Sequence, residues 1–401
     1  MFDKILSFIK KAFVLIVQKT KTFWQWYKNL YKGKRWYTRT LLVFISAIIS
    51  FFIYLFLVDI NFLWLFGKSP GFSQIMNPAT NEASEIYSAD GVMIGKYFNE
   101  NRTPVKYEDV TPHFWRALID TEDERFYKHK GIDPIGMFAV LKEVILRHEA
   151  RGASTITQQL AKNMFRVRTQ YSTGLLGYIP GVRMLIMKSK EWIIATKLEM
   201  IYDKEEILTM YANTVDFGSN SYGIKTACKT YFNTTPAKLT TDQAAILVGM
   251  LKATSYYNPI SNPKNSLARR NVVLHNMLTH NDIDRAAYDS LCLKPIQLNF
   301  SVESNYDGQA QYFRDAVADN LKEWCKDNGY DLYNSGLKIY TTIDTRMQKY
   351  AEEAAIKQMK QVQRNFNNHW SGQEPWRDEN HNVIPHFIED LAKRQPVYKM
   401  L

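Results

Sequence analysis

The chain has 401 residues, of which 46% are hydrophobic and 23% charged. This composition excludes a disordered polymer and provides enough apolar residues for one or two domains with a buried core. The net charge of +11 raises the question of nucleic-acid binding, but residues 1–40 hold ten basic residues and one acid, which leaves +2 for the rest. This distribution gives a nucleic-acid partner little support.

A membrane anchor is predicted directly after the basic arm. Residues 40–58 read TLLVFISAIISFFIYLFLV, contain no charge and are about long enough to cross a bilayer as a helix. The one-sided basic flank predicts that residues 1–40 are cytoplasmic and that the chain beyond the anchor is exported. The run is too long for the apolar part of a cleavable signal peptide. The arm itself, residues 2–18, is amphipathic and suited to the membrane surface.

Changes of pattern divide the exported part. We assign residues 41–66 to the anchor and residues 67–110 to a linker with a β hairpin at Asp90-Gly91. Residues 111–280 carry helical periodicity and form the predicted catalytic domain, interrupted at residues 166–187 by a glycine-rich loop expected to be mobile and to touch the membrane. Residues 281–401 are expected to be a linker and the start of an incomplete region, with one strand and one helix between Tyr330 and Met359.

The stretch TEDERFYKHKGID, residues 121–133, contains the first candidate catalytic residue. If a helix continues through it, the four-residue spacing places Glu122 in line with Leu118 and Phe126. A carboxyl group on an apolar stripe is partly desolvated and suits proton abstraction, whereas Asp123 points about 100° away and takes another role. The alternative is an acidic surface run paired with neighbouring cations, which is the commoner use of such residues.

The stretch GASTITQQLAKN, residues 152–163, predicts an anion site. Thr155 and Gln158 have the spacing of a capping box, so a helix begins here, and its free N–H groups and dipole favour an anion. Lys162 adds a cation without a neighbouring acid, which suits a phosphate or pyrophosphate. Many helices begin with such residues, so the motif alone is weak.

Glu191, in KSKEWIIATKLE, is a second candidate acid. It follows Lys188 and Lys190 on a helix that the periodicity predicts over residues 188–213. Such an acid is commonly a solvated salt-bridge partner. The alternative is the second carboxylate of a cleft, because a separated pair of carboxylates serves glycosyl chemistry.

Taken in order, these three stretches, KEEILTMYANTVDFG and ARRNVVL resemble the five motifs of the peptidoglycan glycosyltransferases, glycosyltransferase family 51, over residues 85–277. The resemblance implies a mainly α fold: a lysozyme-like helical glycosyltransferase domain behind one transmembrane helix and a small β hairpin. Segments near residues 258–271 and 336–354 are similar to the continuation in class A penicillin-binding proteins. The S-x-N and K-T-G motifs of a transpeptidase are missing from the sequence, so transpeptidase activity is not expected from this chain.

The family's roles carry over by motif position. Glu122 matches the catalytic base and Glu191 the second essential acid, while Ala153 and Met187 depart from the glycine and arginine usual in the motifs. The resemblance also implies a divalent cation, expected to be Mg²⁺, with Asp123 as its candidate ligand. The positions that match substrate-binding residues are Asp123, Phe126, His129, Ser154, Thr155, Gln158, Gln159, Lys162, Asn163, Lys188 and Arg269.

The implied activity is polymerisation of lipid II into β-1,4-linked glycan strands, with release of undecaprenyl pyrophosphate, at the outer face of the bacterial cytoplasmic membrane. The expected partners are lipid II, lipid-linked glycan, the membrane and other cell-wall synthesis proteins, with no nucleic acid. Two alternatives remain open. One is a lysozyme-like peptidoglycan hydrolase, and the other is a non-catalytic membrane scaffold of the cell-wall machinery.

Overall fold

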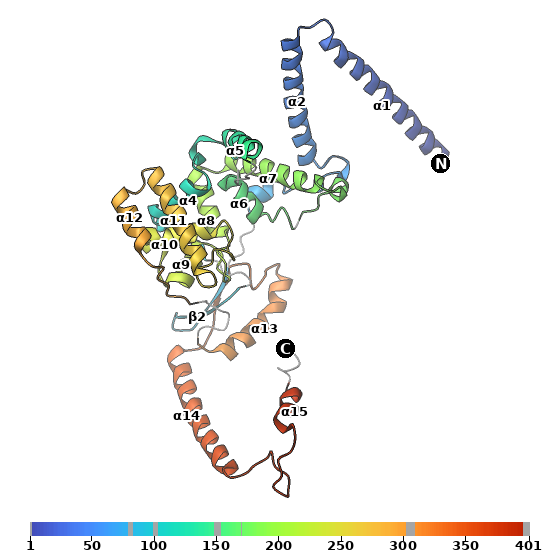
Figure 1. Cartoon of the computed structure of the whole chain (residues 1–401). Helices are drawn as coiled ribbons and strands as arrows, with labels where there is room; N and C mark the ends of the chain where they lie inside the picture. The colour runs from blue at the N-terminus through green and yellow to red at the C-terminus, as the bar shows by residue number, and fades with distance from the viewer. Residues whose placement is uncertain are drawn as a thin grey trace. The chain divides into compact units, whose positions relative to one another are not determined.

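The computed structural model describes residues 2–78, 83–98, 103–147, 154–169, 171–301 and 309–395. The chain divides into two compact units, one of Met1–Ala83 with Phe98–Glu303 and the other of Ser84–Tyr97 with Ser304–Leu401. Helices dominate the described residues, which confirms the predicted mainly α class (Figure 1).

Two long helices begin the first unit, α1 (Phe2–Tyr31) and α2 (Trp36–Asp59). Within the described residues, α2 is the one helix long and apolar enough to cross a membrane, with a mean hydropathy of 2.9. Its C-terminal half packs against α7 (Val182–Ile201), where Figure 1 shows the two helices meeting. Asp59 accepts from the Lys197 ammonium at 2.6 Å, and the Ser189 hydroxyl donates to Tyr54 at 3.1 Å.

The core of the first unit forms around α10 (Thr241–Met250), in which residues 244–250 are all buried. A helix that is apolar on every side needs neighbours on every side. Helices α4 (Pro112–Glu122) and α11 (Pro263–Thr279) pack against it, while α6 (Ile156–Met164) packs against α7 and α8 (Lys204–Thr214). The other α-helices of this unit are α3 (Phe72–Met76), α4 (Pro112–Glu122), α5 (Pro134–Arg147), α6 (Ile156–Met164), α8 (Lys204–Thr214), α9 (Ile224–Phe232), α11 (Pro263–Thr279) and α12 (Arg285–Leu293). Its 3₁₀ turns are η1 (Phe62–Trp64), η2 (Tyr107–Asp109), η3 (Phe126–Lys128), η4 (Leu175–Tyr178) and η5 (Pro236–Lys238).

Three boundaries differ from those predicted. Helix α4 ends at Glu122 rather than continuing through residues 123–127. Helix α7 begins at Val182, so the last part of the loop predicted at residues 166–187 is helical. The long helix expected after Lys188 is broken at residues 202–203, because Asp203 caps α8 by accepting the Glu206 N–H at 2.8 Å.

The second unit has a three-stranded sheet in the order β2-β1-β3. Strand β1 (Ser84–Tyr87) pairs antiparallel with β2 (Met93–Tyr97), as the predicted hairpin requires, and parallel with β3 (Lys338–Tyr340). These backbone bonds join the hairpin to the C-terminal part of the chain rather than to the predicted linker at residues 67–110. The helices here are α13 (Gln311–Asp327), α14 (Thr345–Trp370) and α15 (Phe387–Arg394), of which α13 and α15 were not predicted.

Lys190 on α7 fixes the segments that follow the anchor and precede α7. Its side chain is buried, and its ammonium donates to the carbonyls of Lys68 at 2.7 Å and Ser172 at 2.9 Å. Burial lowers the pKa of Lys190 to about 8. The Leu176 N–H also donates to the Leu65 carbonyl at 3.0 Å, so the two segments lie side by side on α7.

Replacing Lys190 by Met should loosen both segments, because two carbonyls lose a charged donor. We expect faster amide hydrogen exchange at residues 61–69 and 171–178 and a loss of about 2 kcal/mol in the free energy of unfolding. Lys68→Met is the matched control, since that side chain is exposed and its carbonyl remains. Equal amide exchange in the two variants would contradict the conclusion that Lys190 holds the two segments in place.

Candidate active site

Glu122, the last residue of α4, is held by neutral and cationic donors. Its Oε2 accepts from the Gln159 amide at 2.7 Å, and its Oε1 lies 4.0 Å from the Arg269 guanidinium. The Gln159 oxygen accepts from the Tyr211 hydroxyl at 3.0 Å. Burial and the Glu122 charge raise the pKa of Tyr211, so this hydroxyl keeps its proton. With 14% of its side chain exposed, Glu122 is a positioned carboxylate rather than a solvated surface acid.

Glu191 lies on α7, with only 1% of the residue exposed. Its Oε1 accepts from Arg168 Nε at 2.8 Å, and its Oε2 accepts from Lys188 Nζ at 3.0 Å. Lys188 also donates to the Ser154 hydroxyl at 2.8 Å. A buried carboxylate needs such partners to offset its desolvation, and here it aligns two cations beside Ser154.

Lys162 on α6 links the two acids electrostatically. Burial is the largest cause that lowers its pKa, followed by the charge of Arg168, while the charges of Glu191 and Glu122 act in the opposite direction. The Lys162 ammonium therefore interacts with the charges of both carboxylates. The predicted residue Asn163 follows it on α6 and is half-buried.

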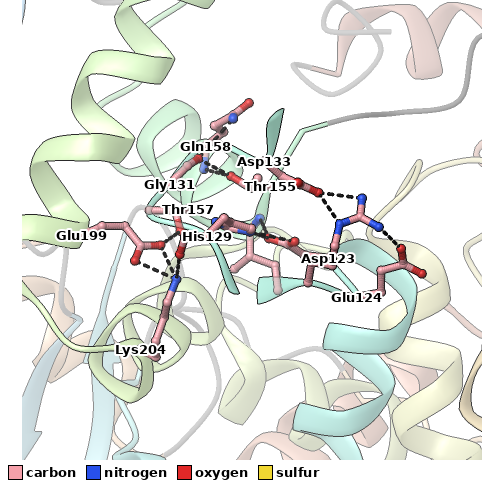
Figure 2. A network of polar contacts seen from close by, with 12 residues as sticks. Asp123, Glu124, His129, Gly131, Asp133, Thr155, Thr157, Gln158, Glu199 and Lys204 are labelled. Carbon is pink, nitrogen blue, oxygen red and sulfur yellow. Dashed lines mark hydrogen bonds and ion pairs between the residues drawn. The ribbon is translucent and has the colours of Figure 1, made fainter. Parts of the chain in front are cut away.

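Asp123 serves the structure of the site (Figure 2). Its carboxylate contacts His129 Nε2 at 2.9 Å and 3.0 Å and accepts the Ile156 N–H at 2.9 Å. These contacts turn the chain out of the helix after Glu122. The sequence predicted an anion at the N-terminus of α6. In the structure the negative group at that terminus is the carboxylate of Asp123.

The same contacts do not fit Asp123 as a metal ligand, since both of its oxygens are engaged and the residue is 8% exposed. Within the ranges that the structure describes, no group of three His, Cys, Asp or Glu side chains is placed to hold a metal ion. Mg²⁺ therefore stays a prediction, and no described residue supports it.

Thr155 and Gln158 bind the Gly131 carbonyl, through Thr155 Oγ1 at 2.7 Å and the Gln158 amide at 3.1 Å. Thr155 accepts the Gln158 N–H at 3.2 Å, which confirms the predicted N-cap, but the Gln158 side chain does not complete the capping box. Gly131 has a φ of +83°, and a Cβ there would lie 2.7 Å from the Ala195 carbonyl oxygen on α7. Only glycine suits this position.

A second set of contacts secures the same loop. Lys204 donates to the His129 carbonyl at 2.8 Å and pairs with Glu199 at 2.7 Å (Figure 2). Its ammonium also lies 4.3 Å from the centre of the buried Phe126 ring. Thr157 on α6 donates to the same Glu199 at 2.6 Å. Phe126 and His129, predicted to bind substrate, are thus packed inside the domain.

Apart from Asn163, the predicted site residues separate into two groups. One group surrounds the two acids: Glu122, Ser154, Gln159, Lys162, Lys188, Glu191 and Arg269. The other is buried and joins the motifs: Asp123, Phe126, His129, Thr155 and Gln158. Sequence reasoning missed Arg168 and Tyr211, since nothing in their local sequence indicates that they meet Glu191 and Gln159.

Residues 90–278 match the protein family described as Transglycosylase. The chain carries a transglycosylase domain. It is 35% identical over 271 residues to penicillin-binding protein 1A of Escherichia coli and 36% identical over 272 residues to that of Haemophilus influenzae. Each match covers 67% of this chain and 30% of the relative.

The transglycosylase domain is homologous to the N-terminal part of these class A penicillin-binding proteins, and this chain spans about 30% of their length. Penicillin-binding protein 1A of Aquifex aeolicus is 35% identical over 286 residues, which is 70% of this chain and 36% of the relative. The crystal structure of the Haemophilus influenzae protein matches with a TM-score of 0.37 and 25% identity, over 69% of this chain and 29% of that one.

Asp123→Ala should destabilise the transglycosylase domain by about 3 kcal/mol, because it leaves the Ile156 N–H and His129 without their buried acceptor. Glu124→Ala, which removes the exposed neighbouring acid, should cost less than about 1 kcal/mol. Urea unfolding of the purified chain in detergent measures both. If the two variants unfolded at the same urea concentration, Asp123 would not be the junction that we describe.

Proposed function

We propose that this chain polymerises lipid II into β-1,4-linked glycan strands and releases undecaprenyl pyrophosphate. The observation that carries the proposal is a pair of largely buried acids held by amide and cationic groups, with Glu122 bound by Gln159 beside Arg269 and Glu191 bound on both of its oxygens. Arg168 and Lys188 add two cations on the Glu191 side. A sugar hydroxyl needs a base at one end of this arrangement, and a departing diphosphate needs cations at the other.

In the proposed reaction, Glu122 takes the proton from the 4-hydroxyl of the acceptor GlcNAc as that oxygen attacks C1 of the donor MurNAc. The new C1–O bond forms as the bond from C1 to the pyrophosphate oxygen breaks, and the configuration at C1 inverts. Gln159 and Arg269 orient the carboxylate of Glu122, and Tyr211 orients Gln159. Fixing donor and acceptor in line provides a large share of the rate.

The diphosphate would be bound by side chains rather than by the N-terminus of α6. Asp123 and Thr155 already accept the N–H groups of Ile156 and Gln158. The available donors are Lys162, Lys188, Arg168 and the Ser154 hydroxyl, with Arg269 beside Glu122. Three of these cations lie around Glu191, which gives the second acid the role of holding them in place.

Contacts between α2 and α7 support a membrane location. Residues of η4 and the start of α7 expose apolar side chains, and α2 packs against the same helix. We propose that α2 crosses the cytoplasmic membrane with residues 1–40 inside, because the arm is basic. The apolar side chains would then enter the outer leaflet, where a lipid-linked donor is found; they are Leu175, Tyr178, Ile179, Met184 and Leu185.

Incubation with purified fluorescent lipid II tests the proposal directly. Glycan strands that lengthen with time on a gel indicate polymerisation. Shortening of finished glycan without growth would instead favour a hydrolase, and no change in either substrate would favour a scaffold. The cations around Glu191 favour the transferase, since hydrolysis of finished glycan has no diphosphate to stabilise.

Glu122→Gln should leave the fold intact and lower the polymerisation rate by about 10² to 10⁴-fold, because the amide cannot accept the acceptor proton. Glu124→Gln, at an exposed position two residues away, should retain the parent rate. Initial rates with fluorescent lipid II, together with thermal unfolding of each variant, give the comparison. Near-parent turnover in a folded Glu122→Gln protein would remove the base assignment.

Arg168→Ala should raise the KM for lipid II about tenfold with a smaller effect on kcat, because it removes one charged contact to the diphosphate. Arg168→Lys should recover part of this loss. Arg183→Ala is the matched control, since Arg183 is exposed on α7. An unchanged KM for the Arg168→Ala protein would show that its guanidinium serves Glu191 alone.

A further inference from the structure

A cavity of about 600 Å³ lies beside α4, away from the two acids of the transglycosylase site. Asp120 lines it and is two residues before Glu122, which places the two side chains about 200° apart around the helix axis. The walls come from η2, α4, η3 and the turn after α11. The side chains that matter to its chemistry are Tyr107, Trp115, Tyr127, Glu108, Asp120 and Asp282.

Asp120 is the unusual residue of this cavity. Only 8% of its side chain is exposed, and in the ionised form its Oδ2 receives no hydrogen bond from the described part of the chain. The nearby basic groups are distant for charged hydrogen bonds: His280 Nδ1 is 3.7 Å from Asp120 Oδ1, and Arg116 Nε is 3.4 Å from Asp282 Oδ1. Burial, followed by the hydrogen bond that protonated Asp120 shares with the Asp282 carboxyl and by the charge of that carboxyl, raises the pKa of Asp120 to about 7.

Aromatic rings form the rest of the cavity. Tyr107 stacks on Trp115 with the ring centres 4.9 Å apart and 11° between the planes, and Tyr127 lines the cavity beside them. Burial is the main cause that raises the pKa of Tyr107 to about 12, so its ring stays neutral. Ring faces next to carboxylates attract organic cations.

We propose that this cavity binds a primary ammonium group carried on a short aliphatic chain. The cavity is lined by three acids, Glu108, Asp120 and Asp282, and one base, Arg116. A bound cation reduces the repulsion between the carboxylates, whereas an anion or a neutral sugar does not. The ammonium gives Oδ2 of Asp120 the donor that it lacks. A metal ion fits poorly, because the described residues provide no set of three ligating side chains here and the rings suit an organic cation.

Such a group has two sources. One is a free amine on a peptide attached to the glycan product, which rests on the proposed function. The other is a lysine side chain of a partner protein. Both present the same ammonium on an aliphatic chain, so the first test uses only that shared chemistry.

The probe is Nα-acetyl-lysine N-methylamide, and its Nε-acetylated form is the neutral control. We expect the full chain in detergent to bind the free amine, measured by saturation-transfer NMR and titration, at least tenfold more tightly than the acetylated form. Asp120→Asn should weaken binding at least tenfold. Asp289→Asn, at an exposed acid on α12, should leave it unchanged.

The pH dependence separates Asp120 from its neighbours. Binding should strengthen as the pH rises through about 7, because Asp120 must lose its proton to receive the ammonium. The charged groups that face Asp120 are Arg116 on its own helix and His280 and Asp282 after α11, with Glu108 across the cavity. Asp120→Asn should remove this dependence, whereas His280→Gln should retain it.

Equal binding of the free and acetylated probes, or unchanged binding by a folded Asp120→Asn protein, would overturn the proposal. Asp282→Asn provides a second variant if Asp120→Asn does not fold, and undiminished binding by it counts against the site in the same way.

Amine-bearing glycan–peptide fragments distinguish the two sources of the ammonium group. Tighter binding than the lysine probe supports the glycan product, and equal binding supports a protein lysine; both retain the ammonium site. Since none of these variants alters Glu122 or Glu191, loss of amine binding with polymerisation intact separates this site from the proposed function.

Discussion

The carboxylate of Asp123 joins the two segments on which the transglycosylase site depends. It accepts an N–H at the start of α6, 33 residues further along the chain, and contacts His129 in its own loop. A single buried acid thereby connects the end of α4, the first N–H of α6 and the loop between them. The dipole of α6 contributes to this junction because the acid lies at the helix N-terminus. The position of Glu122 thus depends on the contacts of the next residue, Asp123.

Because Asp123 binds the N-terminus of α6, the positive charge of the site lies elsewhere than at that helix end. The N–H groups of Ile156 and Gln158 at that terminus are already occupied, and the cations lie around Glu191. Burying Glu191 beside two cations costs less than burying it without them. Arg168 is a partner of Glu191 where the motif lacks the usual arginine at Met187. The site keeps a guanidinium, although it comes from another part of the chain.

What could be predicted from the sequence was local. The N-cap at Thr155, the hairpin at residues 84–97 and the apolar helix α2 each depend on neighbouring residues, and each was predicted. The end of α4 was not, because the contact that ends it comes from a distant segment. The adjacent residues Arg269 and Arg270 also could not be told apart from the sequence. Arg269 approaches Glu122, whereas Arg270 is fully buried and donates to carbonyls at the end of α12. Only packing distinguishes them.

Four consecutive residues of α7 show how the site is tied to its surroundings. Successive side chains on a helix point about 100° apart, so a run of four covers every direction. Lys188 reaches Ser154, Ser189 reaches Tyr54 of the anchor, Lys190 reaches the two segments beside it, and Glu191 reaches Arg168. Polar residues on all sides of a buried helix would be unfavourable without partners. Here each has one, and each partner lies on a different part of the domain. Because the same turn of α7 meets the apolar anchor and holds the cations, any tilt of α7 against α2 must also move the residues proposed to bind the diphosphate. In the proposed membrane arrangement, α7 rather than a flexible linker therefore sets the distance between the membrane and the site.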